Sequence, residues 1–197
     1  MQISMAHMIR GLIFDCDGTL ADTMPLHWQA WQSVCQQHGV RFEEERFYAW
    51  GGIGSIQIFQ TLKDEQGLDI DPVELSRQKE EAFFPFVSGV LPIEPVIRVA
   101  REHRGQIPMA VATGGKRRNC EAVLRTLGVL DWFDAIVTSE DVTNQKPDPE
   151  IFLQAAERIG IPPEECRGYE DTDLGMQAVR AAGMDAVDIR NLLGSPA

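Results

Sequence analysis

Two aspartates separated by one residue stand directly after a short apolar run near the start of the chain. Residues 11–15 read Gly-Leu-Ile-Phe-Asp, and Asp15, Asp17 and Gly18 form an acidic turn behind the run. If the extended backbone persists briefly, Asp15 and Asp17 project to the same side, because alternate residues of a strand share a face. Neighbouring carboxylates repel each other unless a cation or shared proton compensates, so a hard oxygen-binding ion such as Mg²⁺ fits them. Taken alone, the pair is also compatible with a solvated turn, an interpretation that the apolar run before it disfavours.

A metal site at this turn needs further acidic ligands downstream. Glu170 and Asp171 are the candidates, since they follow a strand-like segment and precede a predicted helix. The alternative is an acidic pair at a helix N-terminus, where the helix dipole favours negative charge.

Two other groups could bind an anion. Thr113 ends another apolar run, and the glycines Gly114 and Gly115 follow it at the start of a predicted helix. A hydroxyl and free backbone amides in such a place can receive phosphate oxygens. Lys146 begins a Lys-Pro-Asp-Pro run whose prolines fix the backbone and can direct the ammonium at an anion. Each feature is weak evidence by itself, since most loop lysines are solvated.

The elements that must position these residues alternate between strands and helices. Apolar runs predict buried strands, and apolar residues at three- and four-residue spacing predict the helices between them. Such alternation implies an α/β fold, with a parallel sheet covered by helices on both faces. The predicted strands are residues 11–15, 108–113, 133–138, 166–170 and 184–188, and the predicted helices are residues 94–103, 117–127, 150–159 and 174–182.

Residues 22–91 break this alternation. Helical patterns at residues 26–38, 44–50, 56–66 and 73–86 follow one another there without a convincing strand. We therefore predict a core domain of residues 1–21 and 92–197 and a small all-helical cap of residues 22–91. Its place after the first strand puts the cap above the carboxyl edge of the sheet, where ligands bind in open α/β folds. We interpret its aromatic residues as the cap's own core: Trp28, Trp31, Phe59, Phe83, Phe84 and Phe86.

The amino-acid composition limits the classes of partner and the cellular location that we expect for the protein. A net charge of −12 argues against nucleic acid or an anionic membrane surface, although a locally cationic site can still bind a small anion. The apolar runs are far shorter than the roughly 20 residues that span a bilayer, which predicts a soluble protein. The four cysteines lack metal-ligand spacing and no signal peptide precedes residue 10, so we expect reduced thiols and a cytoplasmic location. Residues 1–7 are interpreted as a disordered lead-in or an upstream start, and a monomer or small homo-oligomer is expected.

Four consecutive strand ends thus supply carboxylates, a hydroxyl and an ammonium in a fixed order. This set resembles the four motifs of the haloacid dehalogenase superfamily, in its phosphatase branch, and the resemblance covers nearly the whole chain. It implies a modified Rossmann core, a helical cap between the first two motifs, and Mg²⁺-dependent hydrolysis of a small phosphorylated metabolite. The matching residues are Asp15-Cys-Asp-Gly-Thr-Leu, Thr113, Lys146-Pro-Asp-Pro and Glu170-Asp-Thr-Asp-Leu-Gly.

The resemblance also implies roles for single residues. Asp15 is similar to the family nucleophile that attacks phosphorus, and Asp17 to the acid that protonates the leaving oxygen and then activates water. By the same resemblance, the phosphate-binding residues are Thr113, Gly114 and Lys146, and the metal ligands are Asp15, the Asp17 carbonyl and Asp171, with Glu170 direct or through water.

Within the phosphatase branch the chain is most similar to sugar-phosphate phosphatases and β-phosphoglucomutases, including the bacterial fructose-1-phosphate phosphatase type. β-Phosphoglucomutases carry a cap-loop arginine that grips the distal phosphate, and residues 50–55 contain none, which opposes a mutase. The glycines of that loop permit close approach to a ligand, although a plain interhelix turn is an equal alternative. The candidate specificity residues are His27, Gly52, Ser55 and Lys116.

Three other activities remain alternatives. Dehalogenases of the superfamily lack the second aspartate of the first motif and need no metal, so Asp17 argues against dehalogenation. A phosphate-accepting signalling domain uses similar groups, but Asp17 is placed to speed hydrolysis and the cap would obstruct a partner. We therefore predict a phosphatase that acts on a sugar phosphate of the fructose 1-phosphate or 6-phosphogluconate type, with a phosphosugar mutase as the alternative.

Overall fold

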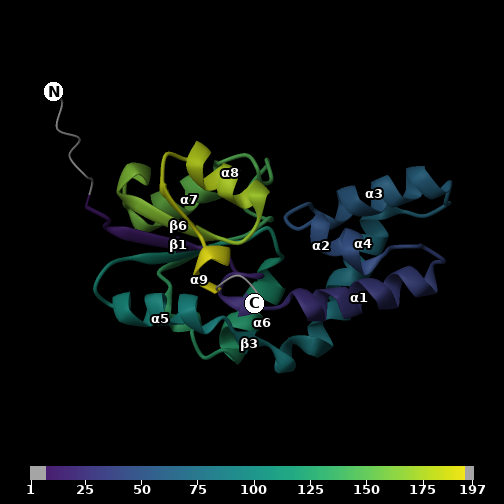
Figure 1. Ribbon diagram of the computed structural model, residues 1–197, viewed down its shortest axis with the longest axis horizontal. Coiled ribbons are helices and arrows are strands. Elements are labelled where there is room, and N and C mark those ends of the chain that lie inside the picture. The colour runs from purple at the N-terminus through teal and green to yellow at the C-terminus, as the bar shows by residue number, and fades with distance from the viewer. Residues whose placement is uncertain (1–7, 194–197) are drawn as a thin grey trace.

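A five-stranded parallel sheet forms the centre of the protein, of which the computed structural model describes residues 8–193. Figure 1 shows the sheet between two helical layers, with a separate group of helices beside it. The strand order is β5-β4-β1-β6-β7. This arrangement confirms the predicted α/β fold class. The strands are β1 (Gly11–Phe14), β4 (Met109–Ala112), β5 (Ala135–Val137), β6 (Cys166–Glu170) and β7 (Asp185–Asp188).

The helices of the core pack on both faces of the sheet. On one face, α5 (Glu94–His103) and α6 (Arg117–Thr126) pack against Leu12 and Phe14 of β1. On the other, α7 (Glu150–Ile159) and α8 (Asp173–Ala181) pack against Ile13. Alternate residues of β1 therefore enter two different hydrophobic clusters, as the two-residue period of a strand requires. Three short elements complete the core: η2 (Leu130–Trp132), η3 (Pro163–Glu165) and α9 (Arg190–Leu193).

The inserted segment folds into the four predicted helices. They are α1 (Met24–Gln37), α2 (Glu44–Ala49), α3 (Ser55–Gln66) and α4 (Pro72–Phe83), followed by the 3₁₀ helix η1 (Phe84–Gly89). Their bounds differ from the predicted ones by a few residues at most, except that the last predicted helix divides at Phe83.

The prediction for the cap aromatics is only partly right. Trp28, Trp31 and Phe59 join the hydrophobic cluster of the cap. Phe83 instead belongs to a core-domain cluster, on which Phe86 also packs, and Phe84 is exposed. The reason is that η1 leaves the cap and runs along α6, so side chains from the last residue of α4 onward meet the core rather than the cap.

The two connections between core and cap pair with each other, which the sequence pattern did not predict. The strands β2 (Ala21–Asp22) and β3 (Leu91–Pro92) form an antiparallel pair, with Asp22 opposite Leu91. Two-residue strands are too short to produce a periodic signal. The pair lies next to the residues at which the predicted cap begins and ends, and the division into core and cap domains stays a prediction.

Two further sequence-based expectations bear on the described residues. All four cysteines are buried and free. Within residues 8–193, no helix combines the length and apolar character needed to cross a membrane. The interpretation of residues 1–7 lies outside the part of the chain that the structure describes.

Candidate active site

Three neighbouring strands deliver the predicted site residues to one edge of the sheet. Asp15 follows β1, Thr113 follows β4 and Glu170 ends β6, and these strands lie side by side in the sheet. The ladder continues past the strand ends, since the amide of Asp15 donates to the Tyr169 carbonyl at 3.0 Å. Backbone pairing therefore fixes the Cα positions of the site before any side-chain contact is considered.

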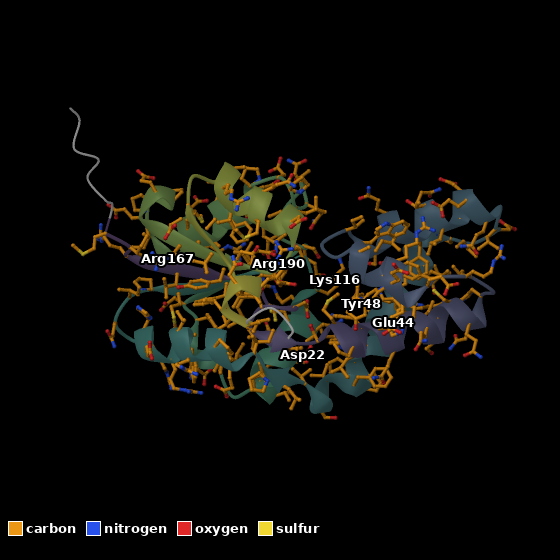
Figure 2. All side chains as sticks on the ribbon, viewed as in Figure 1. Asp22, Glu44, Tyr48, Lys116, Arg167 and Arg190 are labelled. Atoms are coloured by element: carbon orange, nitrogen blue, oxygen red, sulfur yellow. The ribbon has the colours of Figure 1, made fainter. Side chains whose placement is uncertain are left out.

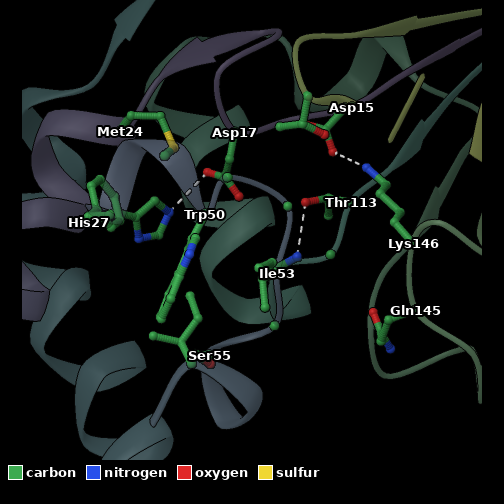
Figure 3. A pocket seen from close by; sticks show the side chains of 18 of the residues that line it. Asp15, Asp17, Met24, His27, Trp50, Ile53, Ser55, Thr113, Gln145 and Lys146 are labelled. Atoms are coloured by element: carbon green, nitrogen blue, oxygen red, sulfur yellow. Dashed lines mark hydrogen bonds and ion pairs between the residues drawn. The ribbon is translucent and has the colours of Figure 1, made fainter. Parts of the chain in front are cut away.

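Lys146 joins this edge from the loop that follows β5. Its Nζ donates to Oδ1 of Asp15 at 2.7 Å and to Oε1 of Glu170 at 2.6 Å, and the three side chains are at most 7 % exposed. Figure 3 shows the ammonium directed at Asp15 with Thr113 beside them. Burial raises the pKa of Asp15 well above its usual range, although the Lys146 charge lowers it. The two carboxylates raise the pKa of Lys146 despite its burial, which keeps the ammonium charged.

Glu170 is held rigidly by the turn behind it. Its Oε2 accepts hydrogen bonds from the amides of Asp171 and Thr172 and from the Thr172 hydroxyl, at 2.8–2.9 Å. The first turn of α8 leaves room for this carboxylate only because residue 175 is glycine. A Cβ on Gly175 would lie 1.9 Å from the Glu170 carboxyl carbon. The turn therefore supplies the donors for Oε2, while Lys146 donates to Oε1, so both oxygens of Glu170 accept hydrogen bonds from the protein.

Asp171 lies on the other side of the same turn, against the backbone of the first motif. Thr19 Oγ1 donates to its Oδ1 at 2.8 Å. Gly18 has a φ of +83°, and a Cβ there would lie 2.3 Å from Asp171 Oδ2. Burial, and then the charge of Glu170, raise the pKa of Asp171 to about 7. The charge of the half-buried Asp171 thus disfavours ionisation of the buried Asp15.

This surplus of negative charge fits a hard cation. No three His, Cys, Asp or Glu side chains within residues 8–193 are placed to hold a metal ion by themselves. The predicted ligand set needs only two carboxylates, Asp15 and Asp171, together with the carbonyl of Asp17. Mg²⁺ characteristically takes one or two carboxylates and completes its shell with water and substrate phosphate. The residues present therefore fit Mg²⁺.

Asp17 points away from the carboxylate cluster and toward the cap. Its Oδ1 accepts a hydrogen bond from Thr23 Oγ1 at 2.7 Å and lies 3.2 Å from His27 Nε2, a contact visible in Figure 3. Burial by itself would raise the pKa of Asp17. The charge and hydrogen bonds of His27, Thr23 and Lys79 outweigh burial and lower this pKa to about 2. Cys16 lies between the two aspartates in the chain and is fully buried in the core.

Two residues of α4 complete this network, and sequence reasoning missed both. Lys79 Nζ lies 3.1 Å from His27 Nδ1 and donates to Glu80 Oε1 at 3.0 Å. The His27 ring stacks on Phe83, with ring centroids 3.9 Å apart. A signal was available, because Lys79 stands four residues from Leu75 and four from Phe83 on one stripe of the helix. A lysine on a buried stripe needs a partner.

Core and cap residues together enclose a cavity of about 160 Å³. We call the residues Asp15, Thr113, Lys146 and Glu170 its core wall, and the residues His27, Lys79 and Glu80 with the loop 50–55 its cap wall. Asp17 lies between the two walls, and Gln145 also lines the space. A cavity of this size suits a compact metabolite, since drug-sized ligands usually occupy roughly 300–1,000 Å³.

Comparison with known proteins identifies the family. Residues 9–183 match the model of the haloacid dehalogenase-like hydrolases. The chain belongs to this hydrolase family. The predicted family and hydrolase class are thereby confirmed.

Individual members of the family resemble the chain over most of its length. The fructose-1-phosphate phosphatase YqaB of Escherichia coli (strain K12) is 41% identical over 182 residues, which cover 92% of this chain and 97% of that protein. A phosphorylated carbohydrates phosphatase of Thermotoga maritima is 30% identical, covering 91% of this chain and 84% of that one. The crystal structure of β-phosphoglucomutase from Clostridium difficile superposes with a TM-score of 0.81 at 26% identity, covering 94% and 88% of the two chains.

The cap loop of this haloacid dehalogenase-like hydrolase lies against the core turn across the cavity. Gly52 lines the cavity with a φ of +87°, and a Cβ there would come within 3.1 Å of Thr172 Oγ1. Ser55 also lines the cavity, and its hydroxyl lies 2.6 Å from that of Ser76. The structure thus brings His27, Gly52 and Ser55 to the predicted place.

Gly114 and Lys116, two predicted site residues that follow β4, differ in whether they line the cavity. Gly114 lines the cavity beside Thr113, whose Oγ1 accepts a hydrogen bond from the Gly115 amide at 3.1 Å. Lys116 does not line it. Its side chain is exposed at the N-cap position of α6, and Figure 2 places it between the core and the cap.

Proposed function

We propose that the protein is a Mg²⁺-dependent phosphatase that hydrolyses a sugar phosphate through an aspartyl-phosphate on Asp15. The bridge from Lys146 to Asp15 and Glu170 carries this proposal. It places a buried cation beside a buried carboxylate in a cavity that also presents Thr113 and Asp17. Phosphoryl transfer needs this combination, because an enzyme must align an incoming oxygen with phosphorus and neutralise the equatorial oxygens.

In the first half of the reaction, a carboxylate oxygen of Asp15 attacks phosphorus, and the bond from phosphorus to the ester oxygen breaks. Thr113 Oγ1, the amides of the glycine loop and Lys146 Nζ bind the phosphoryl oxygens. Asp17 gives a proton to the leaving alcohol. The pKa of Asp17 is low in the free protein, and a phosphate dianion bound nearby raises it, because like charges disfavour the ionised form.

In the second half, water attacks phosphorus and the bond to Asp15 breaks, which releases inorganic phosphate. Asp17, now ionised, takes the proton from that water. Thr23 and His27 hold its carboxylate in place for both transfers. His27 lies in α1, the first helix of the cap domain, and Thr23 is the N-cap residue of that helix. The hydrogen-bonded arrangement around Asp17 is therefore complete when the cap domain lies over the core.

Mg²⁺ would be held by Asp15, the Asp17 carbonyl and Asp171. Bound there, it would neutralise charge on the phosphoryl oxygens and on the carboxylates around it. Both oxygens of Glu170 accept protein hydrogen bonds, which favours a contact through water over direct ligation.

The proposed substrate is a sugar phosphate, with fructose 1-phosphate and 6-phosphogluconate as the first candidates. Two named relatives are phosphatases of phosphorylated carbohydrates, which supports this class. A phosphosugar mutase is the second candidate, since one structural neighbour is a β-phosphoglucomutase. The partner in either case is a small phosphorylated metabolite. A cytoplasmic location, a monomer or small homo-oligomer, and the absence of nucleic-acid and membrane partners stay predictions.

The deciding experiment measures phosphate release from a panel of sugar phosphates with Mg²⁺ and with EDTA. We expect metal-dependent release that falls by more than about 10³-fold in Asp15→Asn. The matched control is Asp173→Asn, which removes a carboxylate that is 80 % exposed, two residues from Asp171. Interconversion of sugar 1- and 6-phosphates without net release would identify the mutase instead. A folded Asp15→Asn protein with full activity would rule out the covalent mechanism.

A further inference from the structure

Glu80 places a fixed negative charge in the cap wall of the cavity. It follows Lys79 on α4, lines the cavity, and has a side chain that is only 19 % exposed. Neither the four sequence motifs nor the proposed catalytic steps account for a buried carboxylate here. Because such a charge is unfavourable without compensation, its partners and its effect on a ligand need explanation.

The carboxylate is anchored across the boundary between cap and core. Lys79 Nζ donates to Oε1 at 3.0 Å, and Asn119 Nδ2 donates to Oε2 at 2.8 Å and to the Glu80 carbonyl at 3.3 Å. Asn119 belongs to α6 of the core and is itself buried. Burial would raise the pKa of Glu80, but the charges of Lys79 and His27 outweigh it and lower this pKa. Glu80 therefore carries its charge at neutral pH in a defined position.

Among the described residues that line the cavity, no lysine or arginine is left unpaired to receive a second anionic group. Among the described residues that line it, the permanently cationic ones are Lys79 and Lys146. Lys146 is engaged by Asp15 and Glu170, and Lys79 by Glu80. The negative charge of a bound phosphoryl group is balanced at the core wall, where the metal ion would also be held. A further carboxylate or phosphate on the same ligand would instead meet the charge of Glu80.

We propose that Glu80 selects phosphate esters whose leaving group is an uncharged polyhydroxy compound and rejects esters that carry a second anion. A carboxylate has about four acceptor positions, and Lys79 and Asn119 occupy two of those on Glu80. The remaining positions can accept charge-assisted hydrogen bonds from substrate hydroxyls. A second anion finds no donor proton there and is repelled, since like charges at close range strongly oppose binding.

The inference rests on the proposed phosphatase activity and narrows its substrates. Fructose 1-phosphate releases an uncharged sugar, whereas 6-phosphogluconate and phosphoglycolate release carboxylates, and fructose 1,6-bisphosphate retains a second phosphate. Among these compounds we expect fructose 1-phosphate to be preferred in kcat/KM by at least about 10-fold.

The test compares this preference in the native protein and in Glu80→Gln. Glutamine keeps the size of the side chain and an oxygen for Asn119, but it removes the charge and leaves Lys79 available to an anion. We expect the ratio of kcat/KM between fructose 1-phosphate and 6-phosphogluconate to fall about 10-fold, chiefly because KM for 6-phosphogluconate decreases. Asn119→Ala is the matched control. It loosens the anchor while keeping the charge, so both substrates should change alike and the ratio should hold.

Calorimetry gives the same comparison without turnover. It measures how tightly fructose 1-phosphate and 6-phosphogluconate bind to Asp15→Asn protein with and without Glu80→Gln. Equal use of both substrate classes by the native protein, or a ratio that Glu80→Gln leaves unchanged, would overturn the role of Glu80. The phosphatase itself would stand in either case. Its own failure would appear differently, as turnover that survives in Asp15→Asn.

Discussion

On the core wall of the cavity, Asp15, Thr113 and Glu170 each stand at a strand end or one residue beyond it. On the cap wall, His27 and Lys79 come from two helices and are 52 residues apart in the chain. Backbone pairing in the sheet positions these three residues of the core wall, whereas side-chain packing between helices positions His27 and Lys79. The proposed nucleophile and two of the phosphate-site residues thus have rigid support, while the residues that hold Asp17 and those proposed for recognition lie on the cap.

The largest loss is expected from Lys146→Ala, on the core wall. Its removal leaves Asp15 and Glu170 without their shared cation and takes away a phosphate contact. We expect kcat/KM for sugar phosphates to fall about 10²–10³-fold or more. Lys116→Ala is the control, because that lysine is exposed outside the cavity and its loss should change little. Strong activity in Lys146→Ala, or a changed substrate preference in Lys116→Ala, would reverse these two assignments.

Gly175→Ala tests whether the rigidity of the core wall matters to activity. The new Cβ would lie 1.9 Å from the carboxyl carbon of Glu170, so this side chain must move and its bond to Lys146 must change. We expect a drop in kcat of about 10²-fold, since small misplacements at a reacting centre have effects of this size. Gly89→Ala, where a Cβ meets no heavy atom within 4 Å, should leave kcat unchanged. Unaltered kcat in Gly175→Ala would show that the Glu170 position is not critical.

This difference between the walls explains how far sequence reasoning could go. The sheet, its flanking helices and the core wall all follow from local patterns, because a strand end fixes where Asp15, Thr113 or Glu170 must lie. Lys146 was found from a short motif in the next loop. Each of these signals lies within a few consecutive residues, so no knowledge of the tertiary structure is needed to read it.

The cap wall could be predicted only in part. His27, Gly52 and Ser55 were found because they stand near the first motif or in a glycine-rich loop. Lys79 and Glu80 were missed because α4 meets α1 only when the cap folds, and meets α6 only when the cap docks on the core. Lys116 was included because it is close to Thr113 in the sequence, although its side chain is exposed at the start of α6 and does not line the cavity. The apolar stripe of α4 marks Lys79 as a lysine that needs a partner, but a local pattern does not say which distant residue the partner is.

Lys79→Met probes the cap wall through Asp17. Without the ammonium, the ring of His27 loses its partner at Nδ1 and holds Asp17 less firmly. We expect kcat to fall about 10-fold, a smaller effect than at the core wall, because Thr23 still donates to Asp17. If Lys79 acts on Asp17 through His27, the double variant Lys79→Met/His27→Gln should be hardly less active than the poorer single variant. Fully additive losses measured by steady-state kinetics would indicate independent roles.

Asp141→Asn removes a carboxylate that belongs to neither wall of the cavity but links the residues after β5 to α6 and α7. Asp141 accepts hydrogen bonds from Thr138 and from the guanidinium groups of Arg117 on α6 and Arg158 on α7, at 2.6–2.9 Å. We expect the free energy of unfolding to fall by about 2 kcal/mol at neutral pH, as hydrogen bonds to a charged group are lost. The value of kcat should change less than about twofold. Asp131→Asn, at an exposed position, is the control.

The pH dependence of this loss follows from the direction of the pKa shift. Burial would raise the pKa of Asp141, but the hydrogen bonds from Arg158 and Thr138, together with the Arg117 charge, lower it well below its usual range. A carboxyl whose pKa is lowered by folding stabilises the native state fully above its unfolded pKa of about 4, and this contribution fades as the pH falls toward the native pKa. The stability difference between native protein and Asp141→Asn should therefore be largest near pH 7 and shrink below pH about 4. Denaturant unfolding at a series of pH values measures it. A stability difference that stays constant down to pH about 2 would mean that Asp141 stabilises the protein by packing rather than by its charge.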